Sequence, residues 1–380
     1  MSVWASLRGQ EAAVALLQRS AQAAAPGHAW LIVGPAGSGR SVAARAFAAA
    51  LQCELRTGCG ECEACREVLA GSHPDVEVVA TATLSYGVDQ MRGLVPAVQS
   101  RPTTGRARVI IIEDADRLTD SAANVLLKPL EEPGALTVLV LCAPAVIDVL
   151  PTIRSRCRVV TLRLPTAGEI ADLLVAEGFD PRVASFAAAA SQGHVGRARR
   201  LAGDPQSQAR RAAVLKLPRE LRSVGSAMTA ALELVQAAEE DSADEVGALA
   251  VKETADLKEA LGIGVRGVST RGTASAIKDL EAQQKSRATR AKRDVLDRAL
   301  VDLAALYRDV LVVQLGASAV AEPVHPDHAE TVRKIAAAYT PEVVLRCVEA
   351  VLRCREAIAA NVSPQLACEA MALALREAAA

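Results

Sequence analysis

The stretch Gly34-Pro35-Ala36-Gly37-Ser38-Gly39-Arg40-Ser41 decides the fold of this chain. The short apolar run 29–33 precedes it, and the alanine-rich, helix-favouring segment 41–51 follows it. A glycine-rich turn between a buried strand and a helix is typical of a phosphate-binding loop, in which backbone N–H groups surround phosphate oxygens. We therefore expect an α/β domain with a parallel sheet, in which these eight residues bind ATP or ADP with Mg²⁺.

One residue of this loop departs from the usual motif, because Arg40 stands where the motif has lysine. The lysine ammonium is a compact charge that reaches the terminal phosphates, whereas a guanidinium is longer, planar and forked. We therefore expect nucleotide binding to be more tolerant of this change than hydrolysis. The chain's own ATPase activity is predicted to be weak or absent.

Two further strands carry unusual residues at their ends. The β-branched run 109–112 ends in Glu113 and Asp114, which are suited to binding Mg²⁺ and activating water. ATPases of this type have the order Asp then Glu, and reversing it moves both carboxylates by one methylene. The run 137–141 ends in Cys142-Ala143, where such ATPases place a polar sensor of the terminal phosphate. An ordinary strand end with solvated acids remains the alternative for Glu113 and Asp114.

The composition limits the class of protein. A length of 380 residues indicates two or three domains, and 51% hydrophobic residues with only 2% aromatic ones predict a largely helical core of Ala, Leu, Val and Ile. The net charge of -1 excludes binding to nucleic acid by overall charge. The apolar run 138–149 is too short for a membrane segment, and the first residues lack the features of a signal peptide. We expect a cytoplasmic protein that does not contact membranes.

Four cysteines lie at metal-binding spacing. Cys53, Cys59, Cys62 and Cys65 form the pattern C-x5-C-x2-C-x2-C, with glycines that permit tight turns. Four thiolates complete a tetrahedral shell around Zn²⁺ and leave no open position, which is typical of a structural site. An iron–sulfur cluster and a redox-active cysteine pair remain alternatives on spacing alone.

The chain resembles the clamp-loader branch of the AAA+ ATPases. The loop, the four-cysteine module and several other motifs carry this resemblance, and together they extend through most of the sequence. These other motifs are Gly9-Gln10-Glu11, His28-Ala29-Trp30-Leu31, Leu126-Leu127-Lys128-Pro129-Leu130-Glu131-Glu132-Pro133 and Ser155-Arg156-Cys157.

The resemblance implies a role in DNA replication within the DNA polymerase III holoenzyme. The implied partners are gamma/tau and delta subunits in a pentameric ring, the sliding clamp and primed DNA. Arg156 would act as an arginine finger in the ATP site of a neighbouring subunit, and Arg197 would be a second phosphate-sensing arginine. Without the resemblance, Arg156 would be equally consistent with a surface salt bridge.

The departures from the hydrolysing motif at Arg40, Glu113-Asp114 and Cys142 favour a member of the ring that is not its motor. The same type of subunit is resembled by two further motifs, His73-Pro74-Asp75 and Val88-Asp89-Gln90-Met91-Arg92. The alternatives are the ATP-hydrolysing gamma/tau motor subunit and a free-standing P-loop protein that binds zinc and DNA. We expect a nucleotide-binding domain over 1–164 with the zinc module at 53–65, a helical lid over 165–205 and a helical collar over 206–380. A basic linker is expected near 262–294, in which the run 285–293 contacts DNA or forms a solvated helix face.

Overall fold

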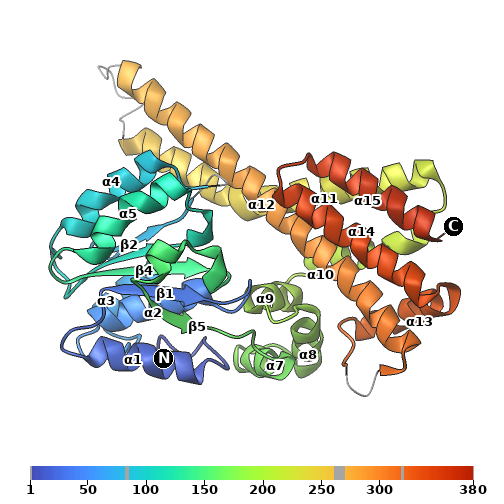
Figure 1. The fold of residues 1–380 in the computed structure, drawn as a ribbon, viewed down its shortest axis with the longest axis horizontal. Helices are drawn as coiled ribbons and strands as arrows, with labels where there is room; N and C mark the ends of the chain where they lie inside the picture. Colours follow the sequence, from blue (N-terminus) through green and yellow to red (C-terminus); the bar gives the residue numbers. More distant parts are fainter. Residues whose placement is uncertain (1, 82–84, 261–269, 318–320, 380) are drawn as a thin grey trace. The chain divides into compact units, whose positions relative to one another are not determined.

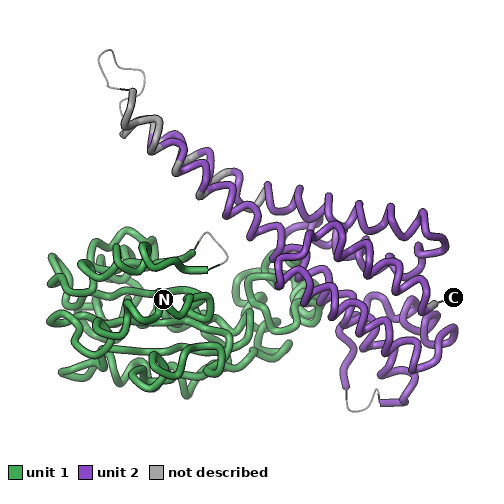
Figure 2. The backbone as a smooth tube through the Cα atoms, turned by 45° about the horizontal axis from the view of Figure 1, so that its top comes forward, with its two compact units in different colours: residues 1–203 green, residues 204–380 purple. Residues whose placement is uncertain are grey.

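The computed structural model describes residues 2–81, 85–260, 270–317 and 321–379 (Figure 1). The chain forms two compact units, Met1–Gly203 and Asp204–Ala380, which are coloured separately in Figure 2. The first unit, Met1–Gly203, contains the four-cysteine module, the glycine-rich loop and Arg156. The second unit contains helices and no strand over its described residues.

The first unit is built on a parallel sheet of five strands in the order β2-β3-β4-β1-β5. The central strands are buried along almost their whole length, which explains their continuous apolar sequences. Because all strands are parallel, their carboxyl ends meet at one edge, where the glycine-rich loop leaves β1. The strands are β1 (Ala29–Val33), β2 (Val76–Val79), β3 (Arg108–Ile112), β4 (Thr137–Ala143) and β5 (Arg158–Thr161).

Helices cover both faces of this sheet. One face packs Trp30 and Ile111 against α1 to α3, and the opposite face packs Leu31 and Ile110 against α4 to α6. Successive residues of one strand thus point to opposite cores, as the pleat requires. The helices are α1 (Glu11–Gln22), α2 (Arg40–Gln52), α3 (Glu63–Ala70), α4 (Val88–Gln99), α5 (Asp120–Glu131) and α6 (Pro151–Arg154), with 3-10 turns η1 (Ala115–Arg117) and η2 (Val146–Asp148).

Three short helices complete the first unit and have a small apolar core of their own. Thr166 starts the first of them with a capping box, in which its hydroxyl accepts from the Glu169 N–H and the Glu169 carboxylate accepts from the Thr166 N–H. These helices are α7 (Ala167–Ala176), α8 (Pro181–Ala190) and α9 (Val195–Gly203). The predicted fold class, a parallel α/β domain followed by helices, is confirmed.

The second unit packs its helices around one apolar core that includes Leu300, Tyr307 and Val344. Residues 270–294 were expected to form a basic linker and instead belong to the long helix α12, because Ala, Lys, Arg and Gln are strong helix formers. The preceding residues 261–269 lie outside the described part of the chain. The helices are α10 (Pro205–Glu220), α11 (Val224–Ala260), α12 (Thr270–Gln314), α13 (Ala329–Ala338), α14 (Pro341–Ala359) and α15 (Pro364–Ala379), with the 3-10 turn η4 (Pro326–His328).

A buried polar cluster fastens the segment before α13 onto α12. The guanidinium of Arg211 donates to His325 Nδ1 at 2.5 Å and to Asp327 at 2.7 Å, and His325 Nε2 lies 3.0 Å from the Asp302 carbonyl oxygen. Since Nδ1 accepts, the imidazole is neutral and donates through Nε2. Burial, followed by the charge of Arg211, lowers the pKa of His325 below its usual value.

This cluster predicts a loss of stability in mild acid. Unfolded histidine binds a proton more readily than the buried His325, so the free energy of unfolding falls as the pH drops below about 6.5. The slope is at most about 1.4 kcal/mol per pH unit for this group. Urea unfolding at pH 7 and pH 5.5 measures it, and His325→Gln should reduce the difference between the two midpoints. An unchanged difference would assign the acid sensitivity to other groups.

Candidate nucleotide and metal sites

The loop between β1 and α2 has the backbone of a phosphate-binding turn. Gly37 and Gly39 both have φ +90°, in the left-handed region that favours glycine. A Cβ on Gly37 would lie 2.7 Å from the Cα of His194, and one on Gly34 would lie 2.8 Å from the Leu162 carbonyl oxygen. The glycines therefore allow both the turn and the close approach of the neighbouring chain segments.

Arg40 folds back onto this loop. Its Nη1 donates to the Gly34 carbonyl oxygen at 2.9 Å, so one arm of the guanidinium closes the loop on itself. Reaching the terminal phosphates of a nucleotide would require that arm to leave the carbonyl. The structure thus gives the unusual arginine a contact within its own loop.

Ser41 of the loop and Glu113, one of the two acids predicted to bind Mg²⁺, lie together. The Ser41 hydroxyl donates to Glu113 Oε2 at 2.6 Å, and Arg45 Nη2 lies 3.8 Å from the other carboxylate oxygen. A hydroxyl and a carboxylate at the carboxyl end of a parallel sheet are suitable oxygen ligands for Mg²⁺. Asp114 directly follows in the left-handed conformation, with φ 48°, and begins the turn η1. The two acids of the reversed pair therefore occupy different backbone environments.

Cys142 lies beside these groups on β4 and is buried. Burial, followed by the charge of Glu113, raises the pKa of its thiol well above the usual value, so the thiol stays neutral. A neutral thiol is a weak donor compared with the polar side chain that related ATPases place here. This residue supports the prediction of a relaxed hydrolysis site.

His194 and Arg197 bring the helix α9 to the loop. His194 packs against Gly37, and its Nδ1 accepts from the Arg197 backbone N–H at 3.2 Å, so the histidine caps the start of the helix. Arg197 is buried. Its predicted role as a phosphate sensor stays a prediction, as do the nucleotide-binding roles of the loop residues.

Gln10 also contacts the loop, since its Nε2 donates to the Ser38 carbonyl oxygen at 3.5 Å, although its sequence context predicted no role beyond its place in a motif. Its Nε2 donates to the Arg163 carbonyl oxygen at 2.6 Å, and its Oε1 accepts from the Arg163 N–H at 3.1 Å. Leu7, three residues earlier, lies 3.3 Å from the position of a Cβ on Gly39. A glutamine after a glycine, just before a helix, was the only signal available in the sequence.

Arg156 lies on the surface of the first unit, outside the loop. Its Nε donates to Glu131 Oε1 at 2.8 Å, its Nη2 donates to the same oxygen, and its Nη1 donates to the Thr152 carbonyl oxygen at 2.7 Å. About a third of its side chain, 34%, remains exposed. The guanidinium is thus held in one orientation while remaining accessible to another molecule.

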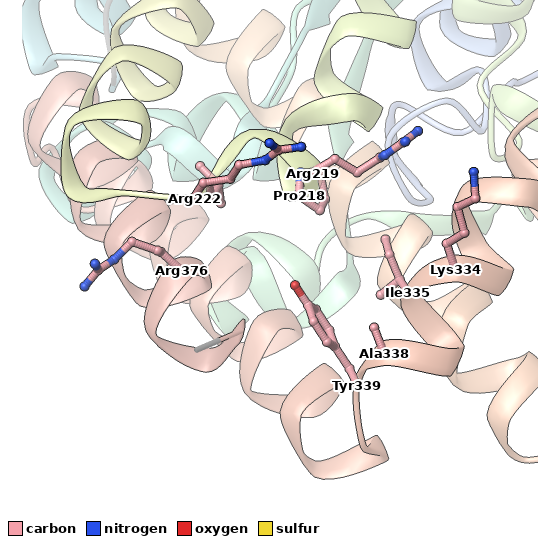
Figure 3. Close-up of a pocket in the computed structure, with 9 residues that line it drawn as sticks. Pro218, Arg219, Arg222, Lys334, Ile335, Ala338, Tyr339 and Arg376 are labelled. Atoms are coloured by element: carbon pink, nitrogen blue, oxygen red, sulfur yellow. The ribbon is translucent and has the colours of Figure 1, made fainter.

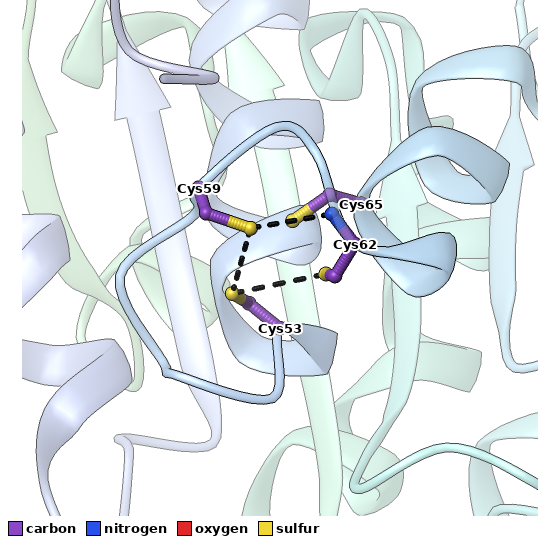
Figure 4. A group of neighbouring side chains, drawn as sticks. All are labelled: Cys53, Cys59, Cys62 and Cys65. Carbon is purple, nitrogen blue, oxygen red and sulfur yellow. Dashed lines mark hydrogen bonds between the residues drawn. The ribbon is translucent and has the colours of Figure 1, made fainter. Parts of the chain in front are cut away.

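The four predicted metal ligands converge, as Figure 4 shows. The sulfur atom of Cys53 lies 3.7 Å from that of Cys59 and 4.0 Å from that of Cys62, and all four sulfurs lie within 4.8 Å of one another. Metal–sulfur bonds of about 2.3 Å in a tetrahedron place the sulfurs about 3.8 Å apart, which fits. These four residues can therefore hold a metal ion.

The backbone around the cluster favours a thiolate at Cys53. Burial alone would raise the pKa of Cys53, but backbone N–H groups, beginning with that of Cys59, outweigh it and lower the pKa to about 6. Burial raises the pKa of Cys65, whose thiol donates to the Ala49 carbonyl oxygen at 3.6 Å. The N-terminal segment closes over the module, since Trp4 Nε1 donates to the Thr57 carbonyl oxygen at 2.8 Å.

We expect one metal ion per chain, bound by this cluster. Cys62→Ser removes one of four ligands and should reduce the metal content severalfold and lower the melting temperature, because metal binding contributes folding free energy. Elemental analysis and thermal melts of the purified protein measure both quantities. Cys157→Ser is the matched control, since Cys157 lies outside the cluster, and equal loss in both variants would contradict the assignment.

The basic run of α12 is largely neutralised within the second unit. Arg287 lies 2.9 Å from Glu253, Lys292 pairs with Glu239, and Arg293 donates to Asn361 at 2.8 Å. Arg290 lies 3.9 Å from Asp294 on the same helix. These pairs favour the solvated helix face over a DNA contact, while Lys285 is exposed.

The sequence matches family models and known subunits of DNA polymerase III. A family model described as "DNA polymerase III, delta subunit" matches residues 9–166, and one described as "DNA polymerase III, delta subunit, C terminal" matches residues 290–377. The DNA polymerase III subunit delta' of Pseudomonas aeruginosa is 42% identical over 145 residues, which are 37% of this chain and 44% of that protein. The Escherichia coli subunit delta' is 38% identical over 154 residues, 39% of this chain and 46% of that protein.

Other relatives are named as tau or gamma/tau subunits of DNA polymerase III. The DNA polymerase III subunit gamma/tau of Mycobacterium tuberculosis is 34% identical over 165 residues, 42% of this chain and 28% of that protein. A solved gamma subunit-related structure from Thermotoga maritima has a TM-score of 0.35 at 18% identity, over 76% of this chain and 98% of that one, which is too weak to carry an argument. The matches span less than half the length of each curated relative named here.

A P-loop on a parallel sheet, followed by helices and matched by both DNA polymerase III models, defines an AAA+ protein of the clamp-loader class. The chain belongs to the delta-prime family of DNA polymerase III subunits. The predicted resemblance is thereby confirmed. No helix in the described ranges is both long and apolar enough to cross a membrane.

Proposed function

We propose that this chain is a largely rigid member of a clamp-loader ring that helps to load a sliding clamp onto primed DNA in the cytoplasm. Its partners in this proposal are gamma/tau and delta subunits in a pentamer. The observation that carries it is the contrast between two arginines. Arg40 is bonded to its own loop, whereas Arg156 is oriented and exposed at the surface.

In this proposal, the chain's own site holds ATP or ADP with Mg²⁺ weakly or structurally. The loop N–H groups would bind phosphates, and Ser41 and Glu113 would hold the ion. Arg156 would place its guanidinium against the nucleotide of a neighbouring subunit, where it stabilises the charge that develops during hydrolysis. The cysteine cluster would hold Zn²⁺ in a closed structural site, and elemental analysis that found iron would contradict zinc.

The purified chain should show negligible ATPase activity. We expect no turnover above background because Arg40, the reversed acids and Cys142 each depart from the hydrolysing arrangement. Steady-state phosphate release measures this, and the same assay after addition of the partner subunits should show activity that depends on them. Turnover near one per second by the chain alone, abolished by Arg40→Ala, would overturn the proposal.

The gamma/tau motor subunit is the second candidate, because gamma/tau proteins match the same part of the chain at 34% identity. Arg40→Lys separates the two. A passive ring member should gain little turnover from the restored lysine, since Glu113 and Cys142 remain, whereas a motor should already be active before the change. Native mass spectrometry with the partner subunits tests a third arrangement, a free-standing protein, which would remain monomeric throughout.

A further inference from the structure

A basic pocket lies within the second unit, and none of the candidate site residues discussed above lines it. Its volume is about 490 Å³, and residues from α10, α13 and α15 and the segment after α10 line it. Figure 3 shows the pocket with its cationic side chains and Tyr339 as sticks. The cations that line it are Arg219, Arg222, Lys334 and Arg376.

The cations of this pocket are poorly neutralised. No carboxylate is among the residues that line it. Lys334 pairs with Glu330 at 2.5 Å, but the guanidinium groups of Arg219, Arg222 and Arg376 have no hydrogen-bond or salt-bridge partner within the described part of the chain. This contrasts with the run on α12, where Arg287 and Lys292 pair with acids of α11.

The surrounding charges confirm a positive environment. The Lys334 ammonium, followed by the charges of Arg219 and Arg333, holds the pKa of Glu330 below its usual value. The single carboxylate of Glu330 therefore faces three cations, and the surroundings of the pocket stay positive. Cations near the end of α10 also compensate its helix dipole, but this role needs neither Lys334 nor Arg376, which lie on other helices.

The floor of the pocket is apolar and includes an aromatic ring. Leu221 and Ile335 are buried, and the ring of Tyr339 is partly exposed beside Ala338. In Figure 3 the Tyr339 hydroxyl points toward the side where Arg219 and Arg222 lie. Arginine forks bind phosphate oxygens in pairs, and an aromatic face stacks on a nucleobase. An apolar floor beneath a cationic rim therefore suits a ligand that carries both phosphates and an aromatic base.

We propose that this basic pocket binds single-stranded nucleic acid, with its phosphates on Arg219, Arg222 and Lys334 and a base against Tyr339. The geometry favours a chain of phosphates because Arg219 and Arg222 come from the end of α10 and the segment after it, whereas Lys334 comes from α13. This site is independent of the nucleotide loop and of Arg156, both of which lie in the first unit.

Fluorescence anisotropy of a labelled oligothymidylate with the full-length protein tests the proposal. The double variant Arg219→Glu/Arg222→Glu should weaken binding at least tenfold and reduce the slope of log affinity against log salt by about 1.4, or about 0.7 per lost phosphate contact. The matched control Arg346→Glu/Arg353→Glu changes the net charge equally on exposed arginines of α14 and should have a much smaller effect. Lys334→Gln, which removes one of the three proposed phosphate contacts, supplies a second, milder variant if the double variant fails to fold, and should reduce the salt slope by about 0.7.

The base contact has its own test. Tyr339→Phe keeps the ring and should retain binding, whereas Tyr339→Ala should lose about tenfold. Equal weakening by the α14 control pair, or no binding by the unaltered protein at low salt, would overturn the proposal. Competition by polyglutamate as effective as that by unlabelled oligothymidylate would assign the pocket to an acidic peptide instead, and displacement by inorganic phosphate alone at low concentration would reduce it to a simple anion site.

Discussion

Arg156→Ala should lower the ATP turnover of a reconstituted clamp-loader ring by a factor of about 10³ or more at the neighbouring site where we propose that this arginine acts. The physical reason is the loss of a guanidinium that stabilises negative charge on the transferring phosphoryl group. In the free chain, Glu131 and the Thr152 carbonyl oxygen already hold the side chain in place, so little ordering remains to be done on assembly. Steady-state phosphate release by rings containing the wild-type or variant chain measures the effect.

The control for this experiment lies two residues away. Arg154, the last residue of α6, is a partly exposed arginine, and Arg154→Ala should leave turnover within a few-fold of the wild type. Arg156→Lys should give an intermediate loss, because lysine keeps the charge without the fork. Size-exclusion chromatography must show intact rings in each case. Full activity of an intact Arg156→Ala ring would reduce this residue to a surface salt bridge with Glu131.

Asp75→Ala should destabilise the first unit by about 3 kcal/mol or more. The Asp75 carboxylate is fully buried and accepts from the backbone N–H groups of Thr103, Thr104 and Gly105 at 2.6–2.9 Å, and from the hydroxyls of both threonines. Removing it deprives three backbone N–H groups and two hydroxyls of their shared acceptor and leaves a cavity where the buried carboxylate lay. The loop before β3 would then lose its main attachment.

The stabilisation by Asp75 should decrease as the pH falls, because its pKa is lower in the folded protein than in the unfolded chain. Burial alone would raise the pKa of Asp75, but the backbone N–H groups of Thr103, Gly105 and Thr104 outweigh it and hold the pKa well below its usual range. The stabilisation is therefore present above about pH 4 and is lost as the pH falls through the folded-state pKa. Urea unfolding of the variant and wild type across this range measures it.

Asp89→Ala is the matched control for Asp75. Asp89 is almost fully exposed and makes one surface ion pair with Arg92 at 3.4 Å, so its removal should change the free energy of unfolding by less than about 0.5 kcal/mol. A similar destabilisation in both variants would show that the Asp75 hydrogen bonds contribute little. These contacts also give His73-Pro74-Asp75 a structural explanation, since His73 Nδ1 accepts from the Asp75 N–H at 3.1 Å.

The parts of the candidate sites that are close in sequence were predictable. The glycine-rich loop and the four cysteines each occupy a single short segment, so their spacing alone specifies the turn or the ligand set. The contact of Ser41 with Glu113 was seen only in the structure, where parallel strands bring their carboxyl ends to one edge. The contact of Arg40 with Gly34 did not follow, since it depends on the side-chain rotamer and not on the motif.

Contacts between distant segments required the structure. The run 285–293 looks basic in sequence, but its partners Glu253 and Glu239 come from α11, so only the pairing of α11 with α12 reveals its neutral character. The basic pocket shows the opposite case, because Arg219, Lys334 and Arg376 are far from one another in sequence and line one pocket only when three helices pack. The expected linker became helix because its residues favour helix and no proline interrupts residues 270–294.

The sequence by itself determined the α/β fold with its glycine-rich loop, the four-cysteine cluster that can hold a metal ion, and the family, because each is encoded in local patterns of a few residues. Tertiary structure decided which charges are neutralised and which remain available. Arg40 turned inward to Gly34, while Arg156 became oriented by Glu131 and stayed exposed. The physical reason is that the effect of a charge depends on the partners within a few ångströms of it, and the packing of distant segments places those partners.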